Sequence, residues 1–182
     1  MIPTEAALPV PSTGDGSAGA VLRRGLLALC GAGVLGTAVE LAMLRHWTSA
    51  VQFVPWAALP LLGLALGALA VRPGRTTVRA ARAVALTVVL VAAFGIFEHV
   101  KANYDAGPLD RRYSTRWETM SEPSRWWAAA AGSVGPSPAL APAVLAQAAA
   151  CLALATAHHP AAGRRRPSQC SPATDRPREA HW

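Results

Sequence analysis

Apolar residues are gathered in four blocks that are almost free of charged side chains, at residues 25–44, 51–71, 83–97 and 139–157. A helix of about 20 apolar residues is long enough to cross the hydrocarbon core of a bilayer. The third block is short, and it reaches full length only if Arg82 and Glu98 snorkel at its two ends. The pattern therefore predicts four membrane helices.

We expect an all-α fold, a four-helix transmembrane bundle formed by residues 21–159. The helices are predicted at about residues 21–46, 50–71, 79–104 and 139–158. The flanking stretches, residues 1–20 and 160–182, show no periodicity and are rich in Pro, Gly, Ser or Arg. Such compositions are typical of disordered tails.

A long outer loop, residues 105–138, is expected between the third and fourth helices. In this loop Thr115 and Glu118 have the spacing of a capping box, and Ser121-Glu122-Pro123 is typical of a helix start. These signals predict short amphipathic helices that lie on the outer leaflet or cap the bundle. They would carry three indole side chains, those of Trp117, Trp126 and Trp127.

Basic residues predict the orientation of the chain in the membrane. They concentrate before the first block, between the second and third, and after the fourth, in the clusters Arg23–Arg24, Arg72–Arg82 and Arg164–Arg166. The positive-inside rule then places both termini in the cytoplasm and the long loop outside. Arg is strongly preferred over Lys, and Ala, Gly and Pro are abundant, as in GC-rich bacteria. We therefore expect a multi-pass protein of the bacterial cytoplasmic (inner) membrane.

The net charge of +7 does not indicate a nucleic-acid partner. The basic residues lie beside membrane helices, and no aromatic pattern for stacking bases is interleaved with them. Gly31–Gly36 matches the letters GxGxxG, but it lies inside an apolar helix rather than between a strand and a helix. We interpret it, together with the GxxxG formed by Gly63 and Gly67, as small-residue helix packing.

A candidate polar or cation site is predicted where the first and third helices reach the outer face. Ionisable groups at membrane depth usually face the bundle interior, and Gly33, Gly36, Thr37 and Glu40 share one helical face. We therefore expect the first and third helices to be neighbours there. The candidate residues are Glu40, Glu98, His99, Asn103, His46 and Gln147.

Two functions remain open for this cluster. In the first, it holds the helices together in a small accessory or interaction protein, whose partners are the lipid bilayer and another membrane protein or a second copy. In the second, Glu40, Glu98 and His99 bind a divalent metal or another cation, or relay protons. No cofactor is predicted, and the sequence contains no nucleophile elbow, phosphate loop or cysteine pair that would indicate an enzyme.

Residues 95–150 resemble a group of uncharacterised small four-helix integral membrane proteins of bacteria. The shared features are Glu98-His99 followed by Asn103, then Trp117-Glu118, and then Pro138–Pro142 leading to Gln147. The resemblance implies a recurring four-helix architecture with an acid–histidine pair and a capping outer loop. It implies no activity, because none is assigned to that group.

Overall fold

The computed structural model describes residues 15–157, which fold into five α-helices and two short 3₁₀-helices, with no strand among them. The α-helices are α1 (Asp15–Met43), α2 (Phe53–Val71), α3 (Arg75–Ala106), α4 (Glu122–Ala130) and α5 (Ala143–Ala157). The 3₁₀-helices are η1 (Gly107–Leu109) and η2 (Trp117–Thr119). The all-α expectation is confirmed for these residues, although they form five α-helices rather than four. Most of the predicted N-terminal tail, residue 158 and all of the C-terminal tail lie outside the described residues.

Three helices are long and apolar enough to cross a membrane. The spans cover Ser17–Met43, Phe53–Val71 and Arg75–Leu109. The fourth expected span is shorter, because α5 has 15 residues and begins at Ala143 instead of residue 139. Pro142 explains this later start, because a proline disfavours helical backbone at the residue before it.

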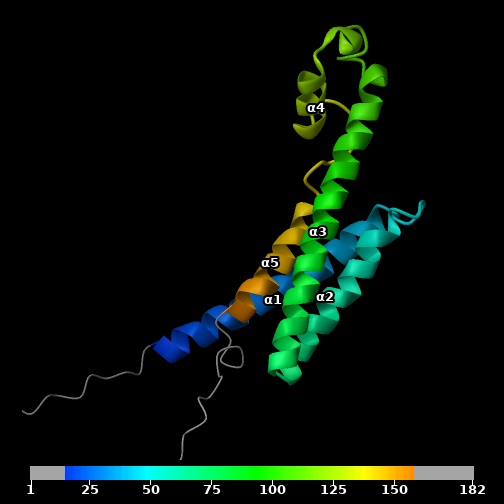
Figure 1. The fold of residues 1–182 in the computed structure, drawn as a ribbon. Coiled ribbons are helices and arrows are strands. Elements are labelled where there is room, and N and C mark those ends of the chain that lie inside the picture. The colour runs from blue at the N-terminus through cyan, green and yellow to red at the C-terminus, as the bar shows by residue number, and fades with distance from the viewer. Residues whose placement is uncertain (1–14, 158–182) are drawn as a thin grey trace, which may run out of the picture.

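α5 packs against both α1 and α3, and α3 is the helix on which α2, α4 and α5 all pack (Figure 1). α2 is a peripheral helix that packs on α3 and, over a smaller area, on α1. Small residues allow these approaches: a Cβ atom added at Gly33 would lie 3.0 Å from Ala148, and one at Gly95 would lie 3.1 Å from Pro142. α1 and α3 are joined through α5 and α2, so the prediction that these two helices are direct neighbours is wrong.

The buried face of α3 follows the spacing of three and four residues expected for one side of a helix. Its buried apolar members are Val78, Ala81, Ala85, Val88 and Ala92. Near the start of this face, Arg82 donates hydrogen bonds to the carbonyl oxygens of Thr156 (2.6 Å) and Ala157 (3.3 Å). A guanidinium at this position satisfies the last carbonyl groups of α5 and opposes the negative end of its dipole.

α3 continues well beyond the other helices (Figure 1). Its 32 residues span about 48 Å at about 1.5 Å per residue, whereas the hydrocarbon core is about 30 Å thick. Residues 107–137, which we call the outer cap because they lie beyond the ends of the other helices, pack on this extension, and their helix α4 lies beside α3. Trp117 is the largest buried side chain of the cap and is only 2% exposed, so it is a core residue rather than a membrane anchor.

Of the two short helices expected in the loop, α4 begins at Glu122 after Ser121, with Pro123 in its first turn. The other consists of η2 alone, and its N-cap residue is Arg116 rather than Thr115. No side-chain hydrogen bond caps η2, so the capping box that the sequence indicated does not form there.

Candidate functional site

Two imidazole rings meet at the outer end of the bundle. His99, on α3, stacks against His46, which follows α1, with ring centroids 6.4 Å apart and an interplanar angle of 18°. Both side chains are half-buried, and His99 Nδ1 is a buried atom to which no described residue hydrogen-bonds. The structure thus brings together two of the six residues that the sequence singled out.

The end of α1 determines where His46 lies. Arg45 adopts a positive φ of 50°, and the backbone N–H of His46 returns to the carbonyl of Leu41 at 2.9 Å. This is the hydrogen-bond pattern of a Schellman C-cap, which turns the chain sharply back over the helix end. The indole Nε1 of Trp56 on α2 donates to the His46 carbonyl at 2.7 Å and fixes the turn.

Glu40 does not point into the bundle as we expected, because its side chain is exposed. Thr37 is buried, and Gly33 contacts α5, but Glu40 is rotated by about 60° from Thr37 around the helix at about 100° per residue. Gly36, on the same side as Glu40, has no neighbouring atom within 4 Å of an added Cβ. Gln147 is exposed as well, because α5 buries its neighbours Leu145 and Ala148 instead.

Asn103 is completely buried and fixes the outer cap to α3. Its amide nitrogen donates to the carbonyl oxygens of Ala129 (3.2 Å) and Ser137 (2.8 Å), and its Oδ1 accepts from the Ser137 N–H at 2.8 Å. Gly135, at φ +75°, passes so close that a Cβ there would overlap Asn103. The polar atoms of Asn103 are therefore occupied by the chain itself, which indicates a structural role.

Aromatic side chains complete the attachment of the cap. Tyr104 stacks on Trp126, with centroids 4.5 Å apart, and meets the edge of Trp117 at 5.4 Å. Trp126 also stacks on Phe97 of α3 at 6.4 Å. At the far end of the extension Gly107 lies directly under the Trp117 ring, in a space that admits no side chain. The cap is thus a packed unit and not a loose loop.

Asp110 organises the turn at the top of the cap. Its carboxylate accepts the backbone N–H of Arg112 at 2.9 Å and pairs with the Arg112 guanidinium at 3.4 Å. The backbone N–H of Gly135 donates to the same carboxylate at 3.4 Å. The hydrogen bond from the Arg112 backbone N–H, and after it those from the Arg112 side chain, hold the pKa of Asp110 below its usual range.

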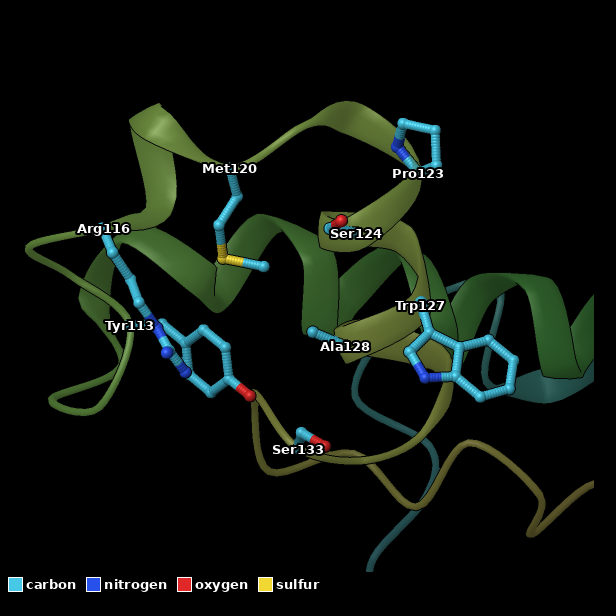
Figure 2. Close-up of a pocket in the computed structure, with 8 residues that line it drawn as sticks. All are labelled: Tyr113, Arg116, Met120, Pro123, Ser124, Trp127, Ala128 and Ser133. Carbon is cyan, nitrogen blue, oxygen red and sulfur yellow. The ribbon is translucent and has the colours of Figure 1, made fainter.

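An open groove of about 630 Å³ lies on the cap between α4 and residues 113–120 (Figure 2). Arg116 and Tyr113 lie at one end and Trp127 at the other, where its side chain is 75% exposed. The groove is lined by Tyr113, Arg116, Met120, Pro123, Ser124, Trp127, Ala128 and Ser133. We did not predict this site from the sequence, and the only local signal for it is that Arg116 follows Tyr113 by three residues.

Among the described residues, no group of three or more His, Cys, Asp or Glu side chains could hold a metal ion. The hypothesis of a divalent metal at Glu40, Glu98 and His99 stays a prediction.

Comparison with protein-family models, with curated proteins and with solved structures gave no match. The resemblance to small four-helix bacterial membrane proteins also stays a prediction.

Proposed function

We propose that this protein is an accessory or interaction protein of the bacterial inner membrane, with four membrane-crossing helices and both termini in the cytoplasm. The positions of the basic residues support this orientation, since Arg72 and Arg75 lie at the connection between α2 and α3, and Arg82 donates to the last carbonyl groups of α5. α5 spans only about 22 Å, so a fourth crossing requires local thinning of the bilayer or snorkelling at its ends.

The interaction function rests on one surface, the GxxxG face of α2. An added Cβ at Gly63 or Gly67 would meet no atom of residues 15–157 within 4 Å, so no other described helix packs into this motif. Leu64 between them is 72% exposed. In a membrane, small residues four apart let a neighbouring helix approach closely, and the gain comes from van der Waals contact rather than from hydrophobicity. An unused motif on a peripheral helix supports association with a helix from another chain.

The test is a photo-crosslinking amino acid at position 64 in membranes that contain the full chain. We expect a crosslink to a second copy or to another membrane protein, and at least a tenfold loss of it in Gly67→Leu. Gly25→Leu is the matched control, because Gly25 on α1 is equally open and lies outside the motif. Unchanged crosslinking in Gly67→Leu, or equal loss in both variants, would rule out this surface.

The histidine pair favours a second candidate, a cation-binding or proton-relaying role at the outer face. His46 and His99 offer nitrogen atoms within one small volume, and the Nδ1 atom of His99 has no hydrogen-bond partner among residues 15–157. Metal analysis of the purified protein tests this role. Stoichiometric metal that disappears in both His46→Ala and His99→Ala would favour it, whereas a loss of stability alone would favour the structural role.

A further inference from the structure

The groove on the outer cap is a separate surface from the α2 face, so it carries an inference beyond the proposed helix association. It is open along its length and has one cationic end and one aromatic end (Figure 2). Ligands that combine an anionic group with an apolar part suit such a lining. The exposed indole at one end and the guanidinium at the other narrow the choice of ligand.

The aromatic end of the groove lies where the helices leave the apolar zone. Trp126, the neighbour of Trp127, stacks on Phe97 of α3. Phe97 comes two residues after Gly95, which contacts Pro142 immediately before α5 begins. Indole rings settle at the level of the lipid headgroups, and the Trp127 side chain is exposed. An exposed indole at this point is therefore suited to contact with a lipid headgroup.

The cationic end carries a charge without an acidic partner in the part of the chain that the structure describes. The Arg116 guanidinium lies 4.3 Å from the centroid of the Tyr113 ring, which orients its planar fork. Among the described residues no carboxylate pairs with Arg116, whereas Arg112 pairs with Asp110. An oriented guanidinium without an acidic partner is suited to binding a phosphate oxygen pair.

The remaining lining suits the glycerol and upper acyl carbons of a lipid. Ser124 and Ser133 place hydroxyl groups along the groove, and Met120 and Ala128 supply apolar surface. A nucleic acid would require a row of cations, but the groove contains only one. A single phosphodiester with attached carbon chains matches both the charge and the apolar lining.

We propose that the groove between α4 and residues 113–120 binds the phosphodiester headgroup of an anionic glycerophospholipid, with Arg116 on the phosphate and Trp127 against the lipid backbone. Such binding ties the cap to the leaflet beneath it. The interaction depends on charge and on the fork geometry of the guanidinium.

Native mass spectrometry of the full chain in non-ionic detergent tests the proposal. Dioleoyl phosphatidylglycerol and dioleoyl phosphatidylcholine are added at equal concentration, and the retained lipid is counted. We expect one phosphatidylglycerol per chain in preference to phosphatidylcholine, and about tenfold weaker retention in Arg116→Gln. Arg116→Lys keeps the charge but loses the planar fork of the guanidinium, so its lipid retention should lie between that of the unchanged protein and that of Arg116→Gln. Trp127→Ala should also weaken retention.

Arg111→Gln is the matched control, because Arg111 is an exposed arginine of the same segment that does not line the groove. Equal losses in Arg111→Gln and Arg116→Gln would reduce the effect to net charge and overturn the proposal. Displacement of the lipid by glycerol phosphate or by an acidic peptide at the same concentration would overturn it as well. The proposed α2 association is measured on Gly67→Leu, which leaves the groove intact, so either proposal can fail alone.

Discussion

Replacing Asn103 with alanine tests whether one buried amide fixes the cap to α3. The variant leaves three backbone groups without their partner, the carbonyls of Ala129 and Ser137 and the N–H of Ser137. The Ala129 carbonyl also accepts the N–H of Gly132 at 3.3 Å, so the cost falls mainly on Ser137. An unsatisfied buried group costs about 1–3 kcal/mol, and water reaches the half-buried Ser137. We therefore expect a loss of about 2–3 kcal/mol.

Hydrogen exchange of the full chain in detergent measures this loss where it occurs. Peptides from residues 107–137 should exchange roughly 30- to 150-fold faster in Asn103→Ala, because the cap opens while the membrane helices stay folded. Gln147→Ala is the control, since it removes an exposed amide and should change stability by less than about 0.5 kcal/mol. A change of less than about threefold in the cap, or a similar change in both variants, would refute the reasoning.

Three further predictions concern single contacts. Gly107→Ala would drive a Cβ atom into the Trp117 ring, so we expect the cap to lose about 1–3 kcal/mol, measured by the same exchange experiment. Arg82→Gln removes the guanidinium from the last carbonyls of α5, and thermal unfolding in detergent should show a loss of about 1 kcal/mol. The Arg112 hydrogen bonds lower the pKa of Asp110 from its ordinary value of 3.8. The ionised carboxylate therefore stabilises the cap above pH 3.8, and this stabilisation is lost as the pH falls through the lowered pKa. Asp110→Asn should remove this acid dependence of cap opening, measured by exchange corrected for the intrinsic rate.

The helices could be predicted from the sequence because hydropathy and length constrain membrane spans strongly. The first helix nevertheless begins at Asp15, because Ala18 and Ala20 favour a helix. The last helix begins later than expected, because Pro142 disfavours helical backbone just before it. Both differences arise from the backbone preferences of single residues, which a hydropathy average over a window of residues does not include.

The candidate site was harder to predict, because it depends on rotation about each helix axis. His99 and Asn103 lie on the packing face of α3, as their spacing suggested, but a rotation of about 60° leaves Glu40 outside the bundle. The partners of Asn103 come from residues 129 and 137, whose positions depend on how the cap folds back. No local pattern specifies such long-range contacts. The groove was missed for the same reason.

The continuity of α3 gives the cap a mechanical link to the bilayer. α3 is one helix from Arg75 to Ala106 and no proline interrupts it, so its outer and inner parts move together. Membrane helices change tilt when the bilayer becomes thicker or thinner. For a lever of about 48 Å, a change of roughly 10° displaces the outer end by about 8 Å. Any change in the tilt of α3 therefore moves the cap with it.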